Sequence, residues 1–144
     1  MNLIITVDTS KQDQLLENVR KSINEFGPRF IMEATPLVQQ TMAQNVPVKT
    51  GRLRASIISD INGSESITST NTGYGLYVDQ PTKAHIIRPN IGKFLRFSIG
   101  GQTIYAREVN HPGTPGTFFI QKTVDAISEE IVNIGKAVWN ELMG

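Results

Sequence analysis

Cysteine is absent from this sequence of 144 residues, which excludes disulfide bonds, thiolate catalysis and cysteine-based zinc sites together. Long apolar runs are absent too, and none approaches the roughly 20 residues that a membrane-spanning helix needs. The first residues, "MNLIITVDTSKQDQ", have neither a basic segment nor a long apolar core. We therefore expect no signal peptide, no membrane association and synthesis in the cytoplasm.

Catalytic and metal-binding patterns are scarce as well. Histidine occurs twice, at His85 and His111, and neither belongs to a His-x-x-x-His or to an Asp/Glu cluster at metal-ligand spacing. No Gly-x-Ser-x-Gly marks a nucleophilic serine. Asp60, Asp79 and Glu108 could converge as an acid/base pair, although acids at turns and strand ends are usually just solvated. The sequence thus predicts no catalytic residue, no metal site and no cofactor.

The composition is that of an ordinary soluble domain, with 39% hydrophobic and 19% charged residues. Domains cluster near roughly 100–150 residues, so we predict a single domain over residues 1–144. A chain of this length buries about two-thirds of its unfolded surface, which is enough for a hydrophobic core of its own.

The net charge of +1 is unevenly distributed along the chain. Residues 1–48 carry −1, residues 49–111 carry +4 and residues 112–144 carry −2. A basic middle suits nucleic-acid binding, but its charges are sparse beside the dense stripes of dedicated DNA-binding proteins. Complementary surfaces on neighbouring subunits explain a basic middle and an acidic end at least as well. The basic residues of the middle are Lys49, Arg52, Arg54, Lys83, Arg88, Lys93, Arg96 and Arg107.

The chain is predicted to begin with a short strand and a long helical region. The strand covers residues 3–8, "LIITVD", because alternating and β-branched residues fill it. Thr9 or Ser10 is the expected N-cap, since either hydroxyl can accept a hydrogen bond from an unpaired backbone amide.

The helical region itself is predicted to end near Asn45. Pro28 and Pro36 each remove a backbone donor, so we expect two or three linked pieces or a kinked rod. Apolar residues recur at three- and four-residue steps and form one stripe along the helix. The stripe consists of Leu15, Leu16, Val19, Ile23, Phe26 and Phe30.

Between about residues 55 and 110 the pattern changes to strands and turns. Asn62-Gly63 and Gly100-Gly101 predict hairpin turns, and the short connections favour antiparallel pairing. The stretch from Gln80 to Pro89 is poor in core residues, which is typical of an exposed loop. The expected strands are "ASIISDI", "SITSTN", "AHIIRP", "KFLRFSI" and "QTIYAREV", with a further short element at "YGLYVD".

A final helix is predicted from about Phe118 to Leu142, after a loop forced by "HPGTPG". His111, beside Pro112, is expected to brace this loop through a hydrogen bond. The helix carries a nearly heptad apolar seam, which favours packing against the rest of the chain over a subunit contact. The seam consists of Ile120, Val124, Ile127, Ile131, Ile134, Val138 and Leu142.

The predicted fold class is α+β, because helices at both chain ends enclose a region of strands. We expect an antiparallel four- to five-stranded sheet packed with a kinked N-terminal helical region and a long C-terminal helix.

The segment "VPVKTGRLRASI" predicts a tight corner after the first helical region. Pro47 stops the helix, and the Thr50 hydroxyl can cap a short turn. Gly51 permits a backbone angle closed to other residues, after which Leu53 and Ile57 return to the core.

Exposed cationic residues are the candidate subunit contacts. Arg52 and Arg54 flank the buried position between them and should point outward. The predicted loop at 80–93 has charge and turn residues with few apolar anchors, which is typical of a segment ordered by a partner. Its candidate contact residues are Lys83, His85, Arg88 and Lys93.

Three sequence elements follow one another in a fixed order. The first has Pro47, Val48, Thr50, Gly51, Leu53, Ser56 and Ile57; the second has Tyr74, Tyr77, Val78 and Asp79; the third has His111, Pro112, Gly113, Thr114 and Phe118. In order and spacing they resemble the head–tail joining and tail-completion proteins of long-tailed bacteriophages. The resemblance covers roughly residues 10–140. It departs from the family at Pro81, where glycine is usual, and at Thr117 and Phe119, where proline and leucine are usual.

This resemblance implies a structural, non-enzymatic virion protein of the neck or tail, made in the host cytoplasm. It implies copies of the chain as partners in a closed ring, expected to be hexameric, with head connector proteins and tail tube or tail terminator proteins beside it. DNA would pass through the lumen without sequence recognition. The alternative is a small nucleic-acid-binding module that uses the basic 49–111 face.

Overall fold

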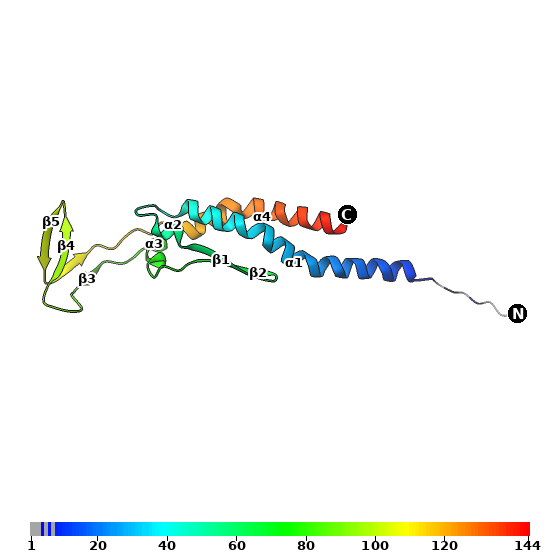
Figure 1. Cartoon of the computed structure of the whole chain (residues 1–144), viewed down its shortest axis with the longest axis horizontal. Helices are drawn as coiled ribbons and strands as arrows, with labels where there is room; N and C mark the ends of the chain where they lie inside the picture. Colours follow the sequence, from blue (N-terminus) through cyan, green and yellow to red (C-terminus); the bar gives the residue numbers. More distant parts are fainter. Residues whose placement is uncertain (1–3, 5, 7) are drawn as a thin grey trace. The chain divides into compact units, whose positions relative to one another are not determined.

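The computed structural model describes residues 4, 6 and 8–144 of the chain (Figure 1). Two compact units are present. Unit 1 contains the residues up to Thr72 together with Phe119–Gly144, and unit 2 contains Gly73–Phe118. The predicted α+β class is confirmed, with long helices near both chain ends and antiparallel strands between them. That the whole chain acts as one functional domain stays a prediction, and the strand predicted at residues 3–8 falls largely outside the described residues.

Helix α1 of unit 1 runs from Ser10 to Asn45 without interruption, so both predicted ends are confirmed. Pro28 and Pro36 lie inside it, where each lacks the N–H that would bond the carbonyl four residues earlier. The chain absorbs these losses by bending, and Figure 1 shows the blue N-terminal part of α1 at an angle to the cyan C-terminal part. The prediction of a kinked rod therefore describes α1 better than that of separate pieces.

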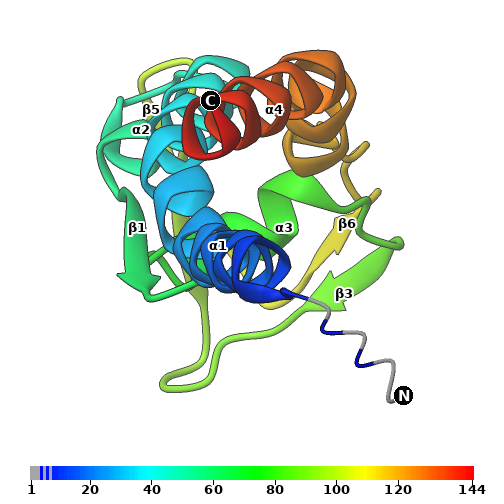
Figure 2. The ribbon, with the colours of Figure 1, turned by 90° about the vertical axis from the view of Figure 1, so that its right-hand side faces the viewer.

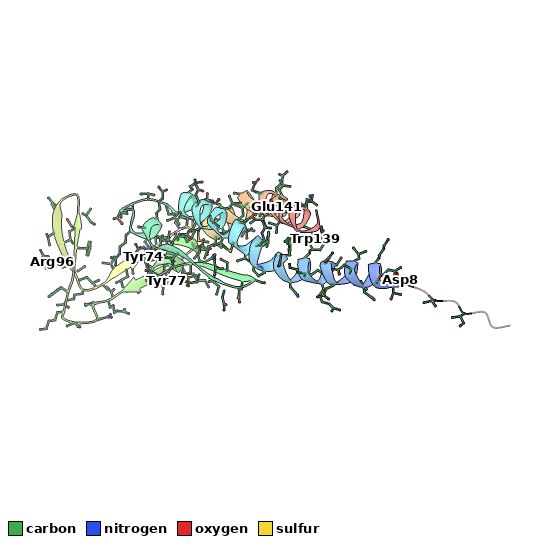
Figure 3. The ribbon with its side chains drawn as sticks, turned by 45° about the vertical axis from the view of Figure 1, so that its right-hand side comes forward. Asp8, Tyr74, Tyr77, Arg96, Trp139 and Glu141 are labelled. Atoms are coloured by element: carbon green, nitrogen blue, oxygen red, sulfur yellow. The ribbon has the colours of Figure 1, made fainter. Side chains whose placement is uncertain are left out.

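The N-terminus of α1 is capped differently from the prediction. Thr9 occupies the N-cap position, but its hydroxyl donates to the Asp13 carboxylate (3.2 Å) and accepts no backbone hydrogen bond. Asp8 instead accepts the Ser10 backbone N–H at 3.0 Å (Figure 3). The side-chain hydrogen bond from Ser10, together with this backbone bond, lowers the pKa of Asp8 below the ordinary aspartate value. A carboxylate accepts more strongly than a hydroxyl, which explains why Asp8 takes the role.

Helix α4 (Phe119–Met143) packs antiparallel beside α1, as Figure 2 shows. Near its start, the Asn45 side-chain amide donates to the Thr123 hydroxyl at 3.2 Å. Near its end, the Ser22 hydroxyl donates to the Leu142 carbonyl at 3.1 Å. These two contacts fix the direction and the register of the helix pair.

Aromatic side chains fill the contact between the two helices. Phe26 and Phe30 stack with ring centroids 5.6 Å apart, and Trp139 of α4 meets Phe26 edge to face at 5.8 Å. Arg29 forms an ion pair with Glu141 at 2.5 Å on the exposed edge of this cluster. Figure 3 shows Trp139 and Glu141 on the last turns of α4.

The predicted seam of α4 is correct in its C-terminal part only. Ile127 and Val138 are buried as predicted, whereas Ile120 and Val124 are about half exposed and Phe119 and Thr123 take their places. Sequence patterns score threonine as polar. Here the Thr123 hydroxyl donates to a backbone carbonyl 2.7 Å away and accepts from α1, so its burial leaves no unpaired group.

The apolar stripe of α1 is also only partly covered. Phe26 and Phe30 are half-buried against α4, but Leu15, Leu16 and Ile23 are exposed. The reason is length, because α4 ends beside Ser22 and α1 continues for three more turns beyond it (Figure 1).

A β-hairpin completes unit 1. Strands β1 (Ile57–Asn62) and β2 (Glu65–Thr70) pair antiparallel and pack against α1. The Gln39 side-chain amide of α1 donates to the Ile57 carbonyl at 3.2 Å and anchors the first strand. The turn lies one residue later than predicted, because Asn62 still pairs with Glu65 as the last residue of β1.

Unit 2 contains one short helix and two further strand pairs. Its elements are α3 (Gly75–Asp79), β3 (His85–Ile87), β4 (Leu95–Ile99), β5 (Gln102–Ala106) and β6 (Val109–His111). β4 and β5 form a hairpin with the predicted glycine turn, whereas β3 pairs with β6, and a strand at β6 was not predicted.

The prediction of one sheet with four or five strands is wrong, since the described strands form three separate antiparallel pairs. The physical reason is that β1 and β2 use α1 of unit 1 as their packing partner. Within unit 2, β3 pairs with β6 and β4 pairs with β5, and neither pair joins the other.

Candidate functional site

The corner between α1 and β1 is built as its sequence predicts. Helix α2 (Arg52–Ala55) follows a Gly51 with a φ of 77°, a left-handed angle that glycine adopts without strain. The Thr50 hydroxyl accepts the backbone N–H of Arg52 at 3.4 Å. Leu53 and Ile57 are both buried, and Pro47 lies exposed after the last residue of α1. Gly51, Leu53 and Ile57 thus take the backbone and core places expected of them at this corner.

Arg52 and Arg54 are exposed on either side of buried Leu53, as predicted. Neither guanidinium forms a salt bridge within the described part of the chain. Two unpaired cations on a four-residue helix are thus available to a neighbouring molecule. Their role as subunit contacts stays a prediction.

A second corner, in unit 2, is formed by His111, Pro112 and Gly113. The His111 Nδ1 atom accepts the Gly113 backbone N–H at 3.1 Å, which confirms the predicted bracing bond. Gly113 has a φ of 85°, and a Cβ atom there would collide with the Thr82 backbone carbonyl. Thr82 and Thr114 also exchange backbone hydrogen bonds of 2.9 and 3.2 Å. The corner therefore clamps the end of unit 2 onto the segment before β3.

The two histidines of the chain meet at this corner, which the sequence did not predict. His85 of β3 lies opposite His111 of β6, and their rings stack with centroids 5.0 Å apart. The His85 Nδ1 atom is 2.9 Å from the Lys83 carbonyl, so this nitrogen carries the proton. Among the described residues, no group of three or more potential ligands is placed to hold a metal ion.

A cavity of about 780 Å³ lies beside the histidine pair. Tyr77, which belongs to the second of the three sequence elements, lines this cavity and is largely exposed. The other lining residues are Leu76, Gln80, Pro81, Thr82, Lys83, His85, His111 and Thr114. This lining combines apolar side chains with a lysine and the two histidines, and among the lining residues there is no carboxylate.

Asp79 has a structural place beside the cavity and is 2% exposed. Its carboxylate accepts a hydrogen bond from the Gln80 side chain at 2.5 Å, and its carbonyl accepts the Phe118 N–H at 2.9 Å. Phe118 has a φ of 51°, a strained angle for an aromatic residue, directly before α4. The second and third of the three sequence elements therefore touch each other through a backbone hydrogen bond.

The predicted 80–93 loop is exposed over most of its length, as expected, but it is not irregular throughout, because β3 lies inside it. Lys83, His85, Arg88 and Lys93 are all exposed. Arg88 forms an ion pair with Glu108 at 3.1 Å, which ties the end of β3 to the start of β6. Their assignment as subunit contacts stays a prediction.

The basic residues of the 49–111 segment are divided between the two units. Lys49, Arg52 and Arg54 belong to unit 1, and the other five belong to unit 2. Arg107 lies over the Phe94 ring at 5.8 Å, and Arg96 projects from β4 (Figure 3). By sequence, unit 2 has a net charge of +3 and unit 1 of −2.

Two apolar surfaces are left uncovered by the other described helices and strands of their own unit. The stripe surface, on the N-terminal part of α1, consists of Leu15, Leu16, Val19 and Ile23. The hairpin surface, on one face of β4 and β5, consists of Leu95, Phe97, Ile99 and Ile104. The period-two spacing of Leu95, Phe97 and Ile99 could have revealed the hairpin surface, but a pattern alone does not show what covers it.

No protein-family model, curated protein sequence or solved structure matches this chain. Among the described residues, no helix has both the length and the apolar character needed to cross a membrane.

Proposed function

We propose that this chain is a structural, non-enzymatic assembly protein of a tailed bacteriophage, which completes the end of the tail or joins the tail to the head. The proposal combines the sequence resemblance with a structural observation. That observation is the presence of the two uncovered apolar surfaces. Soluble monomers rarely expose contiguous apolar patches unless a partner covers them. An isolated two-stranded hairpin is also marginally stable in water, so β4 and β5 gain from being covered.

The three family elements support the same proposal through their placement. The first forms the α2 corner, and the second and third are joined by the bonds of Asp79 and the clamp of Gly113. The residues of each element therefore have structural roles. Such roles are expected of a non-enzymatic assembly protein. In this proposal copies of the chain form a ring, with six subunits expected, between connector and tail proteins.

The proposal is tested on phage particles that lack this protein. We expect DNA-filled heads and separate tails, or tails with abnormal ends, in electron micrographs. Supplying the protein from a plasmid should restore joined, infectious particles. Normal infectious particles in the absence of the protein would contradict the proposal.

The nucleic-acid-binding alternative is tested by a salt titration of purified protein and duplex DNA. Phosphate-driven binding weakens steeply as salt rises, whereas apolar contacts between subunits do not. The described basic residues favour this alternative less, because they are divided between two units and Arg88 is already paired with Glu108. Tight, salt-sensitive DNA binding by isolated monomers would favour it over the ring.

A further inference from the structure

The β4–β5 hairpin of unit 2 has a second face, opposite the hairpin surface. Arg96 of β4 is the cross-strand partner of Tyr105 of β5, and Ser98 pairs with Thr103 two residues further toward the turn. Successive side chains of a strand point to opposite faces of the sheet, so these four side chains share one face. This face is polar and basic where the hairpin surface is apolar.

The same face continues by one more pair at the open end of the hairpin. Leu95 pairs with Ala106, so the next two residues outward are Phe94 and Arg107, and the period of two places both on the face of Arg96. They do meet, because the Arg107 guanidinium lies 5.8 Å from the centroid of the Phe94 ring, in a cation–π contact. We call this the cationic face; it consists of Phe94, Arg96, Ser98, Thr103, Tyr105 and Arg107.

All six side chains of the cationic face are exposed. The exposed fraction is 51% for the Phe94 ring and 62% for Tyr105. Figure 3 shows Arg96 projecting from the hairpin. Each aromatic ring lies across the strand pair from an arginine, so rings and guanidinium groups alternate on an open surface.

The charge of this part of the chain has one sign only. The sequence has no acidic residue between Asp79 and Glu108, whereas it has five basic residues there. Glu108 itself is paired with Arg88 at 3.1 Å. Within the described part of the chain, neither arginine of the cationic face forms a salt bridge. A ligand of this face must therefore supply the negative charge.

We infer that the cationic face binds single-stranded nucleic acid. Unpaired bases stack on exposed aromatic side chains while neighbouring cations contact the phosphates, and this face offers both groups side by side. The Ser98 and Thr103 hydroxyls can donate to phosphate or sugar oxygens. A duplex keeps its bases stacked on one another, and an acidic peptide would engage the arginines but leave the rings of Phe94 and Tyr105 unused. The inference goes beyond the proposed function and does not depend on it, because the cationic face is separate from both apolar surfaces.

The experiment measures binding by the full chain through fluorescence anisotropy. The probe is a fluorescein-labelled oligothymidylate of about 12 nucleotides, a length within the range of single-strand sites. Arg96→Gln removes one phosphate contact, and Tyr105→Thr removes one ring while keeping a residue that suits a strand. The matched controls are Arg20→Gln, which removes the same charge from an exposed arginine of α1, and Tyr105→Phe, which keeps the ring. Circular dichroism melts establish that every variant folds.

The wild type and both controls should bind the probe alike. Tyr105→Thr should bind at least about fivefold more weakly, because it loses a stacked base. With two phosphate contacts, the affinity of the wild type should fall roughly sevenfold between about 50 and 200 mM salt, and that of Arg96→Gln only roughly threefold. The same strand annealed to its complement should bind at least about tenfold more weakly, because its bases are no longer free to stack. A matching oligouridylate distinguishes RNA from DNA, and binding of either strand supports the inference.

Four results would overturn the inference. A wild type that binds neither strand at low salt would show that the face has no such ligand. Equal affinity for the duplex would show that no base stacks on the rings, and equal affinity for a labelled oligoglutamate would show that charge alone is recognised. Unchanged binding by both Arg96→Gln and Tyr105→Thr would place the contact elsewhere on the chain. None of these results touches the proposed function, which the particle experiment judges separately.

Discussion

Two valines on α4 offer a direct test of how this helix is buried. Val138 is 0% exposed and Val132 is 54% exposed, so the same change to alanine can be made in one helix at opposite extremes of burial. Removing two buried methyl groups costs about 0.8 kcal/mol each. The cavity left behind adds about 1 kcal/mol, and the better helix propensity of alanine offsets about 0.5 kcal/mol.

We therefore expect Val138→Ala to lower the free energy of unfolding by about 2 kcal/mol. For a chain of this size that corresponds to a Tm lower by roughly 4–8 °C. Val132→Ala should be neutral or slightly stabilising, because only the propensity gain applies. Differential scanning calorimetry and urea unfolding followed at 222 nm measure both variants. Equal losses at the two positions would refute the assignment of the buried face.

Three further predictions concern the corners and the helix start. Gly113→Ala should lower the Tm, because the new Cβ atom would strike a backbone carbonyl and because φ at this position is positive. Amide hydrogen exchange should then become faster in unit 2. An unchanged Tm would contradict the clamping role of this corner. The lowered pKa of Asp8 means that its stabilisation is complete above the unfolded-state pKa and is lost as pH falls through the folded-state pKa. An NMR titration of this carboxyl should accordingly show protonation at lower pH than in an unfolded peptide. Arg52→Ala and Arg54→Ala should leave the free energy of unfolding within about 0.5 kcal/mol while reducing the yield of joined particles, and normal assembly would exclude the contact role.

The sequence predicts local features of this fold well. Both ends of α1 follow from a polar start and from Pro47, and the turn between β4 and β5 follows from Gly100-Gly101. The turn between β1 and β2 lies one residue after the predicted Asn62-Gly63 pair. The Gly51 corner follows from a residue type that alone tolerates its backbone angle without strain. Each of these features is decided within a few neighbouring residues, so a single sequence contains the necessary information.

Features that depend on distant partners were not predictable. The shift of the buried face of α4 to Thr123 depends on Asn45, which lies 78 residues away. The pairing of β3 with β6, and hence the meeting of His85 and His111, depends on two three-residue strands without a pattern of their own. The partial covering of the α1 stripe depends on where α4 ends. The periodicity of apolar residues does not show which distant segments meet in any of these three cases.

In the sequence, unit 2 is inserted between the two segments that form unit 1, and this order has a consequence for folding during synthesis. The last residue of α1 and the first of α4 are separated by the whole of the hairpin and unit 2, and the Ser22 bond to Leu142 spans 120 residues. At translation rates of 5–20 residues per second, roughly 4–15 s pass between the synthesis of the last residue of α1 and that of the first residue of α4. Its phenylalanines are uncovered throughout that interval, and contacts of such long range slow the final docking. A nascent chain stalled before residue 119 should therefore bind general chaperones, and release should follow once α4 leaves the ribosome.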